Sequence, residues 1–186
     1  MRVYFDSGPF LDYLRFRSEL VSQLRLKSRR GRSQAQISTD LEECLRKLSG
    51  TDHASFTSAL TLVELEDTLQ KDLRRKAKGL PLSNKSYFFL LDGRALLDYV
   101  VSVCQFHQIK IVDLQPAHIG LVLGTAEMKA RKLSFRDSLH IACAVLLDCR
   151  AILTTDSGVL KVDNVFRNSK GDLVRCLDSD QLHLLL

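Results

Sequence analysis

Asp6 and Asp156 are acidic residues that each follow a short strand-forming run, at opposite ends of the sequence. Asp6 follows the strand-like residues of VYFDSGPFLDYL (3–14), and Asp156 ends RAILTTD (150–156). In open parallel sheets the carboxyl ends of the strands form one rim, where ligands bind. If these two strands are neighbours, both carboxylates point into the same rim.

Two further acids lie near the starts of helical patterns. Glu64, in SFTSALTLVELEDTL, follows a strand-like run and opens a helix, which brings it within reach of the same rim. Asp137 opens the apolar helix predicted for 136–148. The alternation of elements does not decide which rim Asp137 faces, because two helices separate the strand at 109–114 from the strand at 150–154.

Each acid also has a purely structural interpretation. Thr61-x-x-Glu64 and Ser134-x-x-Asp137 both fit the capping box, in which the acid accepts a hydrogen bond from an orphan backbone N–H. Asp6 suits the cap of a helix that starts near Pro9, and TTDSG is an ordinary turn sequence. Four independent caps need not converge, however, and a cluster of carboxylates requires compensation by a cation. A hard divalent ion with oxygen ligands, Mg²⁺ or Mn²⁺, supplies it and can activate water against a phosphate ester.

The elements that must position these acids alternate between short β-branched runs and longer helical patterns, which predicts an α/β fold with a mainly parallel sheet flanked by helices. No linker rich in Pro, Gly or Ser divides the chain, so we expect one domain over residues 1–186. Strands are predicted at 2–5, 54–58, 109–114, 150–154 and 165–166. Helices are predicted at 38–48, 61–78, 85–104, 116–130 and 136–148, with residues 172–186 left as strand or helix.

Three segments in order resemble the conserved blocks of PIN-domain nucleases: VYFDSGPFLDYL, TSALTLVELEDTL and LSFRDSLHIACAVLLDCRAILTTDSGVL. The similarity is greatest to the VapC-like toxin ribonucleases of type II (VapBC) toxin–antitoxin systems. The last block is the most specific, because an acid opens an Ala-rich apolar helix and the next strand ends in T-x-D. The resemblance extends from residue 2 to about residue 166.

The resemblance implies a Mg²⁺-dependent endoribonuclease that leaves 5′-phosphate and 3′-hydroxyl ends. It implies an acidic quartet of Asp6, Glu64, Asp137 and Asp156, with Asp6 and Asp137 as the principal metal ligands and Asp156 next. Glu64 acts through water or as general base, and Thr154 is the polar residue beside the metal. RNA, a protein antitoxin and a second copy of the chain are the partners that it implies.

The chain departs from the family pattern in two ways. It carries extra helical length at about 15–50, where the residues are strongly basic, and at about 66–92. Gly158 stands where many relatives carry an acidic or polar residue. The first departure leaves open another RNA-processing role or a partner of its own.

Basic residues near the acids suit an RNA substrate, because phosphate contacts supply most of the non-specific affinity for nucleic acids. We expect RNA phosphate contacts from the two groups Arg29, Arg30, Arg32 and Arg131, Lys132, Arg136. A solvated helix face is the alternative for such groups. His140 shares a helix face with Asp137 and approaches the pocket, although a histidine in an apolar run is more often a hydrogen-bonded core residue.

The composition is that of a globular protein, with a formal charge of +5 and five cysteines without metal-binding spacing. We expect reduced thiols, a cytoplasmic location, no signal peptide and no membrane-spanning segment.

Two other functions remain open. A haloacid-dehalogenase-type phosphohydrolase would use Asp6 as its nucleophile, but Gly8 stands where a second Asp is expected. The other is a non-catalytic PIN-like module that binds RNA or acts as a scaffold.

Overall fold

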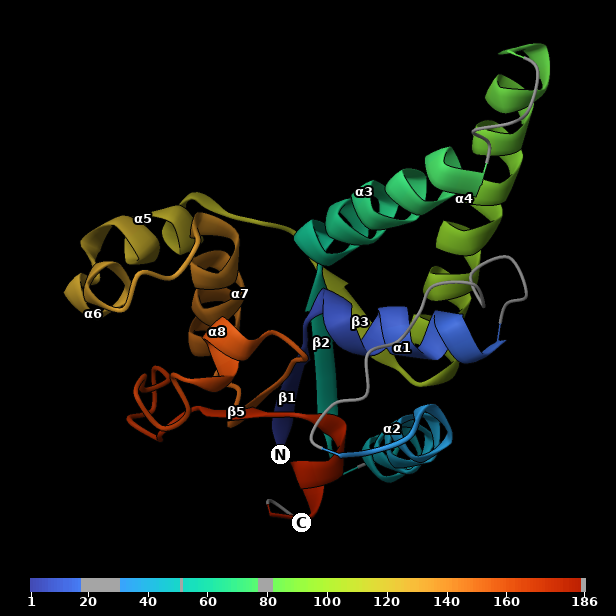
Figure 1. The fold of residues 1–186 in the computed structure, drawn as a ribbon. Helices are drawn as coiled ribbons and strands as arrows, with labels where there is room; N and C mark the ends of the chain where they lie inside the picture. Colours follow the sequence, from blue (N-terminus) through green and yellow to red (C-terminus); the bar gives the residue numbers. More distant parts are fainter. Residues whose placement is uncertain (18–30, 51, 77–81, 185–186) are drawn as a thin grey trace.

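A five-stranded sheet forms the centre of the protein in the computed structural model, which describes residues 1–17, 31–50, 52–76 and 82–184 (Figure 1). Every strand is parallel to its neighbours, and the order is β3-β2-β1-β4-β5. The strands are β1 (Arg2–Phe5), β2 (Ala54–Ser58), β3 (Ile109–Val112), β4 (Ala151–Leu153) and β5 (Arg175–Leu177). The predicted α/β class with a parallel sheet flanked by helices is confirmed.

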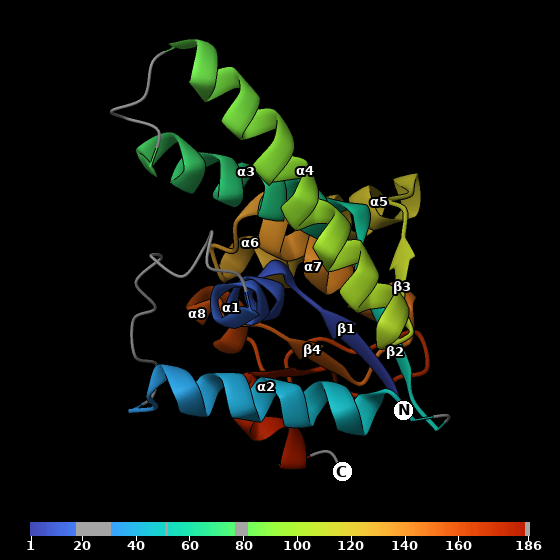
Figure 2. The same ribbon diagram turned by 90° about the vertical axis from the view of Figure 1, so that its right-hand side faces the viewer.

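Helices cover both faces of this sheet (Figures 1 and 2). One face carries α1 (Ser7–Arg17), α2 (Gln34–Leu48), α3 (Ala59–Lys76) and α4 (Leu82–Phe106). The other carries α5 (Pro116–Gly124), α6 (Ala126–Ala130), α7 (Phe135–Leu146) and α8 (Ser157–Leu160). A short 3₁₀ helix, η2 (Ser179–Leu184), follows β5 and packs beside α2.

The central strand β1 contributes to two separate apolar cores, because successive side chains of a strand point to opposite faces. Val3 and Phe5 pack among α1, α2, α3 and α4, whereas Tyr4 lies in the core beneath α7. In β4, Leu153 faces the first core and Ile152 the second. Burial on both faces explains why these strands read as continuous apolar runs rather than alternating ones.

Two predictions along the second half of the chain are wrong. The helix predicted for 116–130 is two helices, because Thr125 adopts an extended backbone conformation and its hydroxyl donates to the carbonyl of Leu121 at 2.6 Å. The strand predicted at 165–166 does not form either. Within the described residues this region has only an isolated antiparallel bridge between Arg167 and Leu173.

Helices α2, α3 and α4 lie wholly or partly in the segments 15–50 and 66–92, and residues 18–30 and 77–81 of these segments are outside the described residues. Helix α2 lies across the end of the molecule next to η2, and α3 pairs with the long α4 beyond the edge of the sheet (Figure 1). None of the helices in the described ranges combines the length and apolar character that crossing a bilayer requires. All five cysteines are free and buried.

Candidate functional site

The site lies at the carboxyl ends of the three central strands. Strand β1 pairs with β2 on one side and with β4 on the other, so Asp6, just past β1, has neighbours from both. The backbone N–H of Asp6 donates to the carbonyl of Leu153 at 3.0 Å, which fixes the chain after β1 against β4. The strands that precede Asp6 and Asp156 are therefore neighbours, which is the condition under which both acids lie at the same rim.

Asp6 is buried, with 5% of its surface exposed, and its carboxylate is held on both oxygens. The hydroxyl of Thr154 donates to Oδ2 at 2.6 Å, and the backbone N–H of Ser7 donates to Oδ1 at 2.6 Å. Thr154 in turn accepts a hydrogen bond from the backbone N–H of Asp156 at 3.0 Å. Thr154 thus lies directly beside the buried acid and connects it to the segment that carries Asp156.

Glu64 and His140 complete a contact group with Asp6. Glu64 lies in the second turn of α3 and His140 on α7, on opposite sides of the sheet. Nε2 of His140 lies 3.0 Å from Oε2 of Glu64 and 3.3 Å from Oδ1 of Asp6. One ligand atom from each of these three residues lies within 4.8 Å of the other two.

A chain of buried hydrogen bonds holds the other ring nitrogen of His140, Nδ1. Its Nδ1 lies 2.8 Å from the hydroxyl of Tyr4, which lies 2.7 Å from Oγ of Ser58. With His140 protonated, Nδ1–H donates to Tyr4 and the Tyr4 hydroxyl donates to Ser58, so every polar atom of the chain is satisfied. His140 is therefore a hydrogen-bonded core histidine that also contacts two acids.

The pKa values of His140 and Glu64 are shifted in opposite directions. Burial alone lowers the pKa of His140, but the hydrogen bond that its Nε2–H donates to Glu64 and the negative charge of Asp6 outweigh burial and raise the pKa overall. Burial likewise raises the pKa of Glu64, but the hydrogen bond and charge of His140 outweigh it and lower the pKa. These opposite shifts are those of an ion pair.

Asp137 and Asp156 do not join this contact, and each caps a helix. Asp137 forms the predicted capping box with Ser134 at the start of α7, with N–H···O distances of 3.1 and 3.3 Å. Oδ1 of Asp156 accepts from the backbone N–H groups of Gly158 (2.6 Å) and Val159 (3.1 Å) at the start of α8. The second oxygen of each acid accepts no hydrogen bond from the described part of the chain.

Electrostatics nevertheless connect these two acids to Asp6. Burial raises the pKa of Asp137 first, and the negative charges of Asp156 and Asp6 raise it further. The structure thus brings all four predicted acids into one electrostatic group, while only Asp6 and Glu64 are in direct contact with His140.

The donor set suits a hard divalent cation. Four carboxylates offer oxygen ligands, and the single buried imidazolium leaves a negative excess. The free oxygens of Asp137 and Asp156 and the raised pKa of Asp137 mark where that excess is uncompensated. In the described part of the chain, the possible ligand atoms that lie within 4.8 Å of one another belong to Asp6, Glu64 and His140, and Asp137 and Asp156 are not in that group.

The residues predicted to contact RNA differ in their exposure to solvent. Arg131 and Lys132, at the end of α6, are exposed, as is Arg136 at the start of α7. Arg136 lies 3.9 Å from the carboxylate of Asp67 on α3, and its charge helps to lower the pKa of Glu64. Arg29 and Arg30 lie outside the described residues.

Arg32 does not fit the predicted phosphate contact, because its guanidinium is engaged within the protein. Its side chain is 11% exposed and lies 2.6 Å from Asp40 and from Asp178, and 3.4 Å from Asp180. These contacts tie the start of α2 to the chain around η2. Arg32 therefore has a structural role that the basic character of its surroundings did not reveal.

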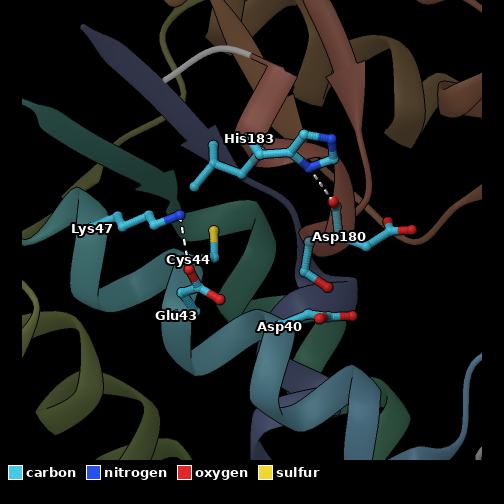
Figure 3. Close-up of a pocket in the computed structure, with 8 residues that line it drawn as sticks. Asp40, Glu43, Cys44, Lys47, Asp180 and His183 are labelled. Carbon is cyan, nitrogen blue, oxygen red and sulfur yellow. Dashed lines mark hydrogen bonds and ion pairs between the residues drawn. The ribbon is translucent and has the colours of Figure 1, made fainter.

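A small pocket lies between α2 and η2, and none of the four predicted acids lines it (Figure 3). Its volume is about 80 Å³, and an ion pair of 2.8 Å between Lys47 and Glu43 lies on its wall. Burial raises the pKa of the Cys44 thiol to about 12, so the thiol is no nucleophile at neutral pH. Catalytic chemistry is better served by the rim at the end of β1.

No protein-family model, curated protein or solved structure matches this chain.

Proposed function

We propose that this protein is a metal-dependent endoribonuclease that hydrolyses RNA phosphodiesters at the rim after β1. The contact of Asp6, Glu64 and His140 at the carboxyl ends of the parallel strands carries the proposal. Asp137 and Asp156, in electrostatic range, add to its support. The PIN-like order of sequence blocks supports the choice of RNA.

The chain's own groups have separable roles in this reaction. Asp6, Asp137 and Asp156 would hold Mg²⁺ or Mn²⁺, and Thr154 orients Asp6 through its 2.6 Å hydrogen bond. The ion, when bound, supplies Lewis-acid stabilisation of the phosphate and lowers the pKa of water. Glu64 is ionised at neutral pH because its pKa is lowered, so its carboxylate accepts the proton of the attacking water. The expected products carry 5′-phosphate and 3′-hydroxyl ends.

His140 serves as an internal counter-charge. Its Nε2–H lies between Asp6 and Glu64 and reduces their mutual repulsion whether or not a metal is bound. The chain through Tyr4 and Ser58 keeps the imidazole ring in this orientation. His140 is therefore a positioning residue for both acids.

The catalytic role of Asp6 is tested with a mixed RNA pool and Mg²⁺. We expect Asp6→Asn to lower the cleavage rate by about 100-fold or more, since loss of even a partner of a metal ligand costs roughly 10–100-fold. Asp52→Asn, on an exposed acid at the opposite rim, is the matched control. Equal rates for Asp6→Asn and the unmodified protein would contradict the proposal.

A non-catalytic RNA-binding role is the second candidate. The position of His140 favours it, because the imidazolium already satisfies Asp6 and Glu64 without a metal. Titration calorimetry with MnCl₂ distinguishes the two: a nuclease binds the ion and loses that binding in Asp6→Asn, whereas a scaffold binds RNA and no ion.

A cytoplasmic toxin that pairs with a protein antitoxin and with a second copy of itself is the narrower form of the proposal. Co-purification with the product of a small adjacent gene and the mass in solution test those two partners.

A further inference from the structure

The exposed basic residues near Asp137 surround a pocket. The pocket lies among the end of α6, the first turn of α7 and α8, and its volume is about 420 Å³, within the range of ligand sites. Three cations line it: Arg131, Lys132 and Lys161. Asp137 forms part of the same wall, so the pocket opens directly beside the acidic site.

Acids of the described part of the protein do not neutralise these three cations. No ion pair joins Arg131, Lys132 or Lys161 to an acid within the described ranges, and all three side chains are exposed. Arg136, by contrast, lies beside Asp67 on the α3 side. Among the residues that the structure describes, the free positive charge near the site is therefore concentrated on the side of α6 and α8.

The backbone holds Lys132 in a conformation that a glycine adopts more readily. Its φ is +55°, and it follows the C-cap of α6. Its N–H donates to the carbonyl of Lys129 at 3.1 Å, and the N–H of Leu133 donates to Met128 at 3.4 Å. This is the Schellman pattern, whose left-handed position is usually glycine. The lysine side chain is retained there at a conformational cost.

The acidic site itself repels a phosphodiester, because two carboxylates share a single imidazolium and the carboxylates of Asp137 and Asp156 add further negative charge. An RNA chain needs favourable charge nearby to remain over the carboxylates, and cations in a concave wall provide it. Asp137 belongs to both features, so a strand held in the pocket passes over the acids.

We propose that the pocket lined by Arg131, Lys132 and Lys161 binds a backbone phosphate of the RNA next to the one that is cleaved. This inference rests on the proposed function and deepens it. The site accordingly takes a polynucleotide rather than an isolated phosphate monoester, since two neighbouring phosphates are engaged at once.

Binding is measured without catalysis, as the fluorescence anisotropy of a fluorescein-labelled twelve-nucleotide oligouridylate in EDTA at increasing KCl. The two test variants are Lys132→Gly and Lys161→Ala. Each is expected to weaken binding about five-fold at low salt, and to reduce the slope of log affinity against log salt by roughly 0.7, the value for one single-strand phosphate contact. Lys132→Gly should keep or raise the thermal unfolding midpoint, because glycine suits the left-handed position.

Two control variants isolate the effect. Lys170→Ala removes the same charge at the opposite rim, where Lys170 lines a pocket with Arg150 and Asp172. Gln108→Gly makes the same backbone change at another left-handed residue, between α4 and β3, without a change of charge. Neither should alter the affinity or the salt slope.

The outcomes separate this proposal from the proposed function. Unchanged binding in both test variants, an equal loss in Lys170→Ala, or no RNA binding by the unmodified protein would overturn the pocket assignment, even if RNA is cleaved. Poly-L-glutamate that binds as tightly and with the same sensitivity would overturn the choice of phosphate. If the two test variants alone lose binding and the unmodified protein cleaves no RNA, the pocket assignment is supported and the nuclease function is refuted.

Discussion

His140 is the residue on which the acidic site depends most when no ion is bound. Its imidazolium lies between two carboxylates, and the Tyr4 hydroxyl fixes the other ring nitrogen. Removal of His140 leaves Asp6 and Glu64 as neighbouring buried or half-buried anions without their cation. We therefore expect the stability of the metal-free protein to follow the protonation of this one ring.

The sign of that pH dependence follows from the raised pKa of His140. The contribution of the imidazolium is fully present below the unfolded pKa of about 6.5 and is lost as the pH rises through the folded pKa. Between pH 6 and 8 in EDTA, the free energy of unfolding should fall in the unmodified protein relative to His140→Gln. At pH 6 the variant should be less stable by roughly 2 kcal/mol, the size of a charged hydrogen bond.

Urea denaturation across this pH range measures both effects. His107, whose pKa burial lowers, titrates in the same range but is present in both proteins, so its contribution cancels in the difference. A difference that stays constant from pH 6 to 8 would contradict a raised pKa of His140 in the folded protein.

At the scale of elements, the site depends on how closely α1 approaches the loop after β4. A Cβ added at Gly8, in the first turn of α1, would lie 2.0 Å from Oγ1 of Thr155. Gly8 follows Asp6 by two residues, and Thr155 lies between Thr154 and Asp156. This close approach therefore sets the spacing of the two segments that carry the acids.

The sign of the stability change caused by Gly8→Ala tests this spacing. Alanine at an exposed helix position stabilises by about 1 kcal/mol relative to glycine. Gly8→Ala should instead destabilise the protein by about 2 kcal/mol, the usual cost of overpacking, and should lower RNA cleavage. Thermal unfolding with the double variant Gly8→Ala/Thr155→Gly, against Thr155→Gly alone, is the control: alanine should be tolerated once Thr155 is removed. A stabilising Gly8→Ala would contradict the close approach.

The sequence was most informative where an element depends on its own residues. The strand before Asp6 and the capping box of Asp137 are local features, so propensity and spacing predicted both correctly. The rim that Asp137 faces is not local, because α5 and α6 intervene between β3 and α7 and their packing decides the direction. For this acid the family resemblance, not the pattern, supplied the placement.

Where tertiary contacts decide, the pattern was insufficient. The sequence of residues 172–186 is compatible with strand or helix. In the described residues up to 184 the structure has β5 and then η2, because β4 supplies a partner for Arg175–Leu177 alone. The contact of His140 with Glu64 joins α7 to α3 across the carboxyl ends of the central strands. The spacing of three residues from Asp137 was the one signal in the sequence that pointed to it.

At the scale of the molecule, the two apolar cores on either side of the sheet enclose all five thiols. Burial raises the pKa of Cys143 to about 11 and that of the other four cysteines to about 12. A thiol reacts as its thiolate, so native cysteines at pH 7.5 should react with Ellman's reagent at least about 100-fold more slowly than the guanidinium-unfolded chain. A single fast thiol in the native protein would show that one core opens locally. Each Cys→Ser variant, assayed in turn, would identify it.

The position of β1 in the sheet has a consequence for synthesis of the chain. This strand is synthesised before its two partners in the sheet, β2 and β4, which follow it by roughly 50 and 150 residues. The residues that surround the Asp6 carboxylate are synthesised after it, in the order Glu64, His140 and Thr154. A nascent chain that ends before β4 therefore carries an incomplete site.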